Sequence, residues 1–198
     1  YRAELQDGTV KLPFKFLPEL RLDNAQLRYQ DEHVFLSKAT VSAWRDTRIK
    51  ASGEWDLGSR KFSVQGDAEG IRCEDLLGAD WAKRLTGGIR SDFTADNSRG
   101  EFSANGNLTL TDGTITALPM LDALAAYADT RRFRVLTLSE SRCHWSWKKD
   151  ELALSELVLA SEGLVRLEGS LTVRGDQLDG VFRLGLAPGT LSSIPGAE

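Results

Sequence analysis

Few residues in this 198-residue chain have the types and spacing that catalysis requires. His33 lies beside acidic residues and His144 lies in a strand-like run, and neither is accompanied by the other members of a catalytic triad. Asp112 precedes a glycine, which is typical of a turn, and the pair Glu74-Asp75 is typical of a solvated turn. The sequence has no glycine-rich phosphate loop, zinc-protease motif or nucleophile elbow. We therefore predict that the chain is not an enzyme and uses no cofactor.

Cys73 and Cys143 are the two cysteines of the chain. They lack the paired spacing of zinc ligands, so we expect no metal site. In an oxidising compartment they could form a disulfide, which would add about 4 kcal/mol of stability in the chain-entropy model. The alternative is two separate, small, buried side chains. The sequence leaves both alternatives open.

Trp145 and Trp147 share one face of a predicted strand. Two indole rings on one face could stack on sugars or bases, whereas the alternative is packing against neighbouring strands. The net charge of −4 offers no basic surface for nucleic acid, and we predict no nucleic-acid partner. The densest basic run, Arg131-Arg132-Phe133-Arg134, fits the cations that favour a helix C-terminus.

Hydrophobic residues make up 41% of the chain and charged residues 27%, as in globular proteins. No run approaches the roughly 20 apolar residues that cross a bilayer as a helix. The chain opens at Tyr1 in strand-like sequence and ends in a Pro/Gly-rich tail over 188–198. We therefore interpret it as a fragment of a longer protein, whose targeting or anchoring segment could lie outside it.

Apolar and polar residues alternate with a period of two along most of the chain, in runs spaced by about ten residues. This pattern predicts a mainly β fold, a long antiparallel meander forming a curved, groove-like or partly closed sheet. We expect one domain over 1–198, with 1–70 and 71–187 as a possible subdivision. Two sets of residues are each predicted to share a face, namely Phe35, Ala39, Val41 and Ala43, and Ile49, Ala51, Gly53 and Trp55.

Two segments depart from the strand pattern. A helical stripe of leucines and alanines predicts one amphipathic helix at about 118–130, preceded by a turn at Asp112-Gly113. A short helix or turn is predicted near 74–85. At Ser155-Glu156 the alternation slips by one residue, which predicts a β-bulge.

A sheet with one apolar face must cover that face, and a single helix can cover only part of it. If the sheet stays open, the uncovered strip is suited to acyl chains, whereas a sheet that closes on itself would bury it. We therefore predict phospholipid or another acyl-chain lipid as a partner. The predicted lipid-contacting residues are Leu108, Leu110, Val165, Leu167, Leu171, Val173, Phe182 and Leu184.

Several motifs follow one another in a defined order around the predicted helix. They are Gly106-x-Leu108-x-Leu110-x-Asp112-Gly113-x-Ile115, then Leu118-Pro119-x-Leu121, then Leu157-x-Leu159-x-Ser161, then Leu167-x-Gly169-x-Leu171-x-Val173. Over about residues 50–187 the chain resembles the C-terminal region of AsmA-like proteins.

This resemblance implies a repeating β-groove of the bridge-like lipid transporters of the Gram-negative cell envelope. It implies a periplasmic location, a parent anchored in the inner membrane, and phospholipid transport that serves outer-membrane biogenesis. It implies no catalytic residue. The alternative function is a structural scaffold or interaction module that pairs through its sheet edges with other envelope proteins or neighbouring repeats.

Overall fold

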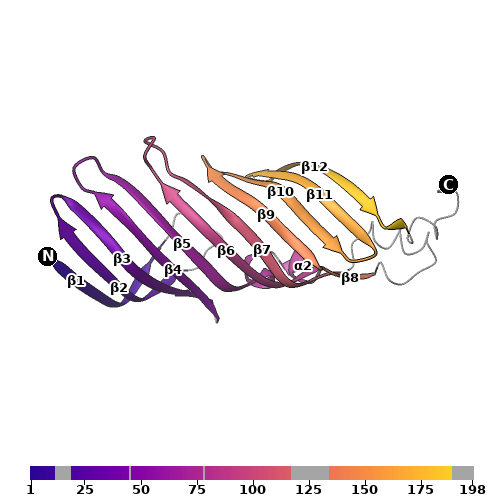
Figure 1. The fold of residues 1–198 in the computed structure, drawn as a ribbon, viewed down its shortest axis with the longest axis horizontal. Coiled ribbons are helices and arrows are strands. Elements are labelled where there is room, and N and C mark those ends of the chain that lie inside the picture. Colours follow the sequence, from indigo (N-terminus) through magenta and orange to yellow (C-terminus); the bar gives the residue numbers. More distant parts are fainter. Residues whose placement is uncertain (12–18, 45, 78, 117–133, 189–198) are drawn as a thin grey trace. The chain divides into compact units, whose positions relative to one another are not determined.

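The computed structural model describes residues 1–11, 19–44, 46–77, 79–116 and 134–188 (Figure 1). In these ranges the chain consists mainly of β-strands, with two short helices, α1 (Cys73–Leu76) and α2 (Ala79–Ala82). The strands are β1 (Arg2–Val10), β2 (Leu20–Gln30), β3 (His33–Ala43), β4 (Thr47–Asp56), β5 (Lys61–Arg72), β6 (Leu85–Asp96), β7 (Ser103–Thr116), β8 (Val135–Thr137), β9 (Glu140–Lys148), β10 (Glu151–Ser161), β11 (Val165–Arg174) and β12 (Gln177–Leu186).

The twelve strands form one antiparallel sheet in which hydrogen-bonded neighbours follow the order of the sequence. Only β8 departs from this path, because it pairs with β7 while β9 continues the sheet on from β7. The predicted mainly β, antiparallel meander is confirmed, as are the short helices near 74–85. The helix predicted at about 118–130 and all but the first residue of the 188–198 tail lie outside the described residues.

The chain forms two compact units. Unit 1 contains residues 1–71, 90–108 and 145–152, and unit 2 contains residues 72–89, 109–144 and 153–198. Strands β5, β6, β7, β9 and β10 each contribute residues to both units, although only Arg72 of β5 lies in unit 2. The possible subdivision into 1–70 and 71–187 stays a prediction.

In unit 1, the pairing of β1 to β5 places most apolar residues of these five strands on one side of the sheet. Residues that pair directly across antiparallel strands project from the same face. We call this side the apolar face of unit 1. It carries Ala3, Leu5 and Gly8 on β1; Leu20, Leu22, Ala25, Leu27 and Tyr29 on β2; Val34, Leu36, Ala39, Val41 and Ala43 on β3; Thr47, Ile49, Ala51, Gly53 and Trp55 on β4; and Phe62, Val64, Gly66 and Ala68 on β5.

The predicted face containing Ile49 and Trp55 agrees with this pairing, because β4 and β5 pair without a register shift. The prediction for Phe35 is wrong. A register shift between Leu36 and Ala39 inverts the alternation, so that Phe35 lies on the polar face opposite Arg28. There the Arg28 guanidinium lies 4.7 Å from the centroid of the Phe35 ring, and His33 stacks on the same ring.

Strands β7 and β10 each contain a residue with left-handed backbone conformation. Asp112 has a φ of 52°, and β7 runs through it to Thr116, so the prediction of a turn at Asp112-Gly113 is wrong. A residue with positive φ suits a tight turn as well as an irregular strand. Here the strand continues beyond Asp112, because Thr114 to Thr116 of β7 pair with β8. Glu156 has a φ of 50° inside β10, where the phase slip predicted a bulge.

In unit 2, β11 and β12 pair over their whole length without a shift. We call the side with their leucines, Val165 and Val173 the apolar face of unit 2. The ring of Phe182 lies over Gly169, its direct partner, and over Gly180, because a Cβ built on either glycine would meet ring atoms at 2.8 and 2.9 Å. The face consists of Val165, Leu167, Leu171 and Val173 on β11 and Leu178, Phe182, Leu184 and Leu186 on β12.

Replacing Gly169 by alanine should destabilise the protein by about 1–3 kcal/mol, because the new methyl group overlaps well-packed atoms. Its Cβ would lie 2.1 Å from the carbonyl oxygen of Val181. The matched control is Gly185→Ala, whose Cβ would meet its nearest atom at 3.6 Å and should change stability by less than about 0.5 kcal/mol. Urea unfolding measures both, and equal midpoints for the two variants would contradict this packing.

Candidate functional site

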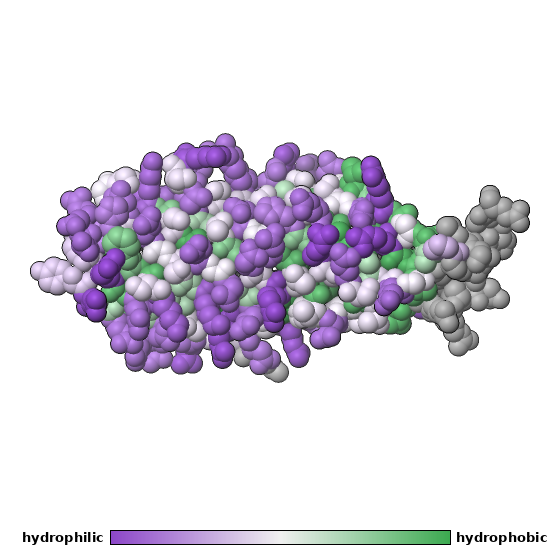
Figure 2. Space-filling view, in the orientation of Figure 1, coloured by the Kyte–Doolittle hydropathy of each residue, from purple (hydrophilic) through white to green (hydrophobic). Residues whose placement is uncertain are grey.

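The structure brings six of the eight predicted lipid-contacting residues onto one surface, the apolar face of unit 2. Exposure along this face rises from β11 to the edge strand β12. Val165 is 8% exposed, whereas Phe182 and Leu184 are 45% and 43% exposed. Figure 2 shows hydrophobic residues at the surface over β11 and β12.

The other two predicted residues lie on β7 and belong to different units. Leu108 is half-buried in unit 1, whereas Leu110 is buried in unit 2. The Leu110 side chain lies against the backbone of Gly87 and Gly113. Leu110 therefore packs within unit 2 and offers little surface to a ligand.

Sequence reasoning missed four exposed apolar residues that the strand pairing places on the two apolar faces. Leu178 is 69% exposed on the face of unit 2, and Leu5, Tyr29 and Trp55 are 47%, 41% and 51% exposed on the face of unit 1. Each alternates with polar neighbours, and this alternation was the available signal. It could not show exposure, which depends on what lies against each residue.

The opposite side of unit 2 carries a chain of four charges. Arg166 Nη1 lies 2.6 Å from Glu140 Oε2 and Arg166 Nε lies 2.7 Å from Glu168 Oε1, while Arg142 Nε lies 3.1 Å from Glu140 Oε1. Hydrogen bonds from Arg166 and then Arg142 lower the pKa of Glu140, and those to Glu140 and Glu168 raise the pKa of Arg166. Because β10 lies between β9 and β11, the Glu140–Arg166 pair spans a strand. The two sides of the sheet thus differ sharply in polarity.

The polar side of unit 1 is similarly charged. Arg21 pairs with Asp7 at 3.1 Å, the Ser42 hydroxyl donates to Asp23, and Lys50 pairs with Glu69 at 3.9 Å. The two exposed ion pairs contribute little to stability. They keep this side hydrated, which makes the apolar face of unit 1 the better surface for a hydrophobic ligand.

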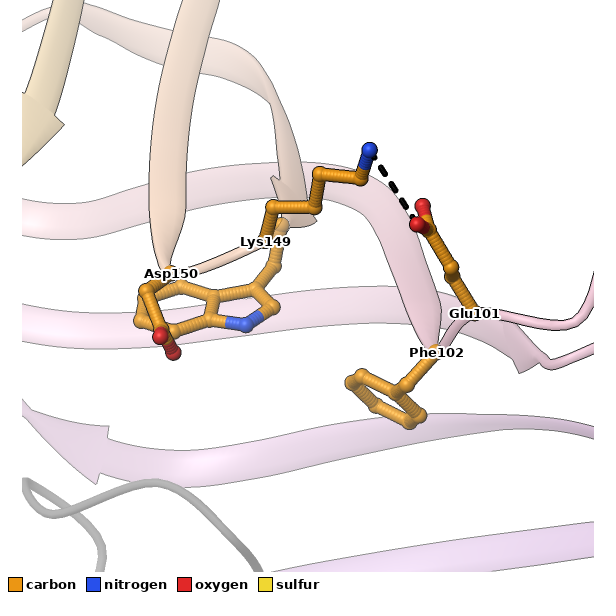
Figure 3. Close-up of a pocket in the computed structure, with 5 residues that line it drawn as sticks. Glu101, Phe102, Lys149 and Asp150 are labelled. Atoms are coloured by element: carbon orange, nitrogen blue, oxygen red, sulfur yellow. Dashed lines mark ion pairs between the residues drawn. The ribbon is translucent and has the colours of Figure 1, made fainter.

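Unit 1 also contains a pocket of about 370 Å³ (Figure 3). It is lined by Glu101 and Phe102, which precede β7, by Trp147 near the end of β9, and by Lys149 and Asp150 in the turn between β9 and β10. Lys149 Nζ lies 3.1 Å from Glu101 Oε1 at the rim. The pocket combines two aromatic side chains with charges of both signs.

Trp145 and Trp147 do not have equivalent surroundings. The indole N–H of Trp145 donates a 2.9 Å hydrogen bond to the hydroxyl of Ser91 on β6, and both residues are half-buried. Trp147 lines the pocket. Trp145 therefore packs across the sheet, which agrees with the packing alternative, whereas Trp147 borders a cavity.

Two strands of unit 1 end in ionised carboxylates, Asp56 on β4 and Asp96 on β6. The Ser59 hydroxyl donates to Asp56 at 2.6 Å and its backbone N–H donates at 3.0 Å, and these bonds lower the pKa of Asp56. Ser98 lowers the pKa of Asp96 in the same way. Both carboxylates stay charged at neutral pH.

Cys73 and Cys143 are free, buried thiols, with 2% and 8% of their surfaces exposed. This agrees with the alternative of two buried side chains without a bond between them. Burial raises the pKa of both thiols to about 11, and the nearby Glu74 carboxylate adds to the effect at Cys73.

In the described ranges, no group of three or more histidine, cysteine or acidic residues is placed to hold a metal ion. Among the residues that the structure describes, no helix has the length and apolar character needed to cross a membrane. The absence of enzymatic activity stays a prediction.

The fold and the site together define a class of protein, an antiparallel β-meander with chemically opposite faces. No protein-family model, curated protein or solved structure matches this chain. The resemblance to AsmA-like proteins therefore rests on the sequence motifs alone.

The buried thiols should react slowly with Ellman's reagent, because the thiolate is the reactive form and the folded protein holds both thiols protonated. In the folded protein the reaction rate should rise only as the pH approaches about 11. After unfolding without a reductant, both cysteines of the chain should react quickly with Ellman's reagent at about pH 8, which is near the ordinary thiol pKa. If neither cysteine reacts with the reagent after unfolding, the two are joined in a disulfide.

Proposed function

We propose that this chain is a non-enzymatic, periplasmic segment of an AsmA-like envelope protein that holds or conducts phospholipid along the apolar faces of its sheet. The observation that carries the proposal is the cross-strand pairing. It gathers the apolar residues of each unit on one side, and part of that side is exposed. The resemblance to AsmA-like proteins supports the location between the inner and outer membranes.

The exposed part of each apolar face offers apolar side chains to hydrocarbon. Leu178, Phe182 and Leu184 lie along one face of the edge strand of unit 2 with 43–69% of their surfaces exposed. Each methylene group removed from water contributes about 0.8 kcal/mol. An acyl chain that covers several of these side chains therefore gains several kcal/mol, whereas the charged side offers no such gain.

A second candidate function is pairing through a sheet edge with another envelope protein or a neighbouring repeat. The strand order ends at β12, whose outer edge has no partner strand among the described residues. Residues 177–185 of β12 are all exposed. An open edge of this kind can pair with an added strand.

The lipid proposal predicts different effects for two exposed residues on opposite sides of β12. Leu184→Asp places a charge on the apolar face and should reduce co-purified phospholipid several-fold. Val181→Asp is the matched control, because Val181 is 72% exposed and lies on the charged side opposite Ser170. The measurement is lipid extraction and mass spectrometry of chains purified from a Gram-negative host.

Both substitutions affect exposed side chains, so thermal unfolding should show that both variants remain folded. Equal lipid content in the two variants, or none in the unchanged protein, would count against lipid binding on this face. A protein partner that co-purifies without lipid, and is lost when β12 is altered, would favour pairing through the edge.

A further inference from the structure

The aromatic residues of unit 1 gather at one end of its apolar face. Tyr29 pairs with Val34, Val34 with Trp55, and Trp55 with Phe62, so these side chains form one line across four strands. The line continues at both ends. The rings of Tyr1 and Tyr29 lie 6.5 Å apart, those of Phe62 and Phe102 lie 6.2 Å apart, and Phe102 and Trp147 line the same pocket. We call Tyr1, Tyr29, Trp55, Phe62, Phe102 and Trp147 the aromatic row.

At the other end of the same face the side chains are small and buried. Ala43 and Thr47 are each 3% exposed and Ala68 is 6% exposed, whereas Tyr29 and Trp55 are 41% and 51% exposed. The aromatic row therefore occupies the open end of the apolar face. A ligand with a hydrocarbon part can reach this face at the row, where the large side chains are exposed.

Charged residues of both signs lie in the turns beside the row. Asp31 and Glu32 follow β2, Arg60 precedes β5, and Lys149 and Asp150 lie between β9 and β10. Aromatic side chains favour the level at which hydrocarbon meets polar headgroups in a lipid layer. The order of apolar face, aromatic row and charged turns repeats the order of acyl chain, glycerol region and headgroup.

The pocket at the end of the row fits an ammonium group and a phosphate together. Trp147 and Phe102 supply ring faces that attract a cation, and Glu101 and Asp150 supply carboxylates. Lys149 lies at the rim, as Figure 3 shows, where its ammonium group can pair with a phosphate. With two carboxylates and one lysine, the lining favours a ligand that carries a positive charge.

We infer that this pocket binds the zwitterionic headgroup of a phospholipid, with the ammonium group against Trp147 and the carboxylates and the phosphate at Lys149. The acyl chains extend past the aromatic row onto the apolar face of unit 1. This inference rests on the proposed function, because it names the class of lipid that the same surface selects. A headgroup with a phosphate and no cation would draw Lys149 away from Glu101 and bring no cation to the two carboxylates.

The test uses the 198-residue chain with short-chain lipids below their micelle concentration, measured by calorimetry. Dihexanoyl-phosphatidylethanolamine should bind more tightly than dihexanoyl-phosphatidylglycerol, which has the same acyl chains. A cation on an exposed aromatic ring contributes about 0.5–1 kcal/mol, so Trp147→Leu should reduce this preference about twofold to fivefold. The double variant Glu101→Gln, Asp150→Asn should abolish the preference.

The matched control is Trp81→Leu, because Trp81 is a 54% exposed tryptophan on α2, outside the pocket. This variant should keep the preference of the unchanged protein. If both lipids bind equally well to the unchanged protein, or the pocket variants keep the preference, the headgroup site is overturned and acyl-chain binding still stands. If neither lipid binds and Leu184→Asp leaves the co-purified lipid unchanged, the proposed function itself is overturned.

Discussion

The register of antiparallel pairing is the constraint on which the other features of this protein depend. A residue on one strand and its direct partner on the next must project from the same side of the sheet. Leu22, Val41 and Ile49 are neighbours on the apolar face of unit 1 for this reason alone, although they come from three strands. A shift of one residue in any of these pairings would place apolar side chains among charged ones.

The same apolar periodicity supplies residues that stabilise the fold and residues that can bind a ligand. Which role a residue has depends on whether other parts of the protein cover it. Leu20, Val41 and Ala43 form a buried cluster against which Leu22, Trp44 and Ile49 pack, and burial of this kind stabilises the unit. Tyr29 and Trp55 belong to the same face and stay exposed. The opposite sides carry ion pairs whose exposed charges add little stability, and their role is to keep those sides in water.

Sequence reasoning predicted the fold class and the apolar face of unit 2, because the period of two is unbroken in β11 and β12. It failed at Phe35, since nothing in the residues after Leu36 signals the register shift that turns this ring to the polar side. The predicted turn at Asp112-Gly113 was wrong because an aspartate before a glycine suits a bulge as well as a turn. The aromatic row was not predictable, because its residues lie far apart in the sequence and come into one line only in the folded sheet.

The left-handed residues inside the strands have a consequence for how the chain can change in length. Asp112 in β7 and Glu156 in β10 each have a positive φ inside a strand, and beyond Asp112 the buried positions of β7 change from even to odd numbers. Deleting one of them would turn the remainder of its strand by half a turn. Apolar side chains would then project from the polar face and polar side chains from the apolar face. Gains and losses of single residues are therefore more harmful within strands than in the hairpin loops that do not line the pocket, so divergence in length should accumulate in those loops.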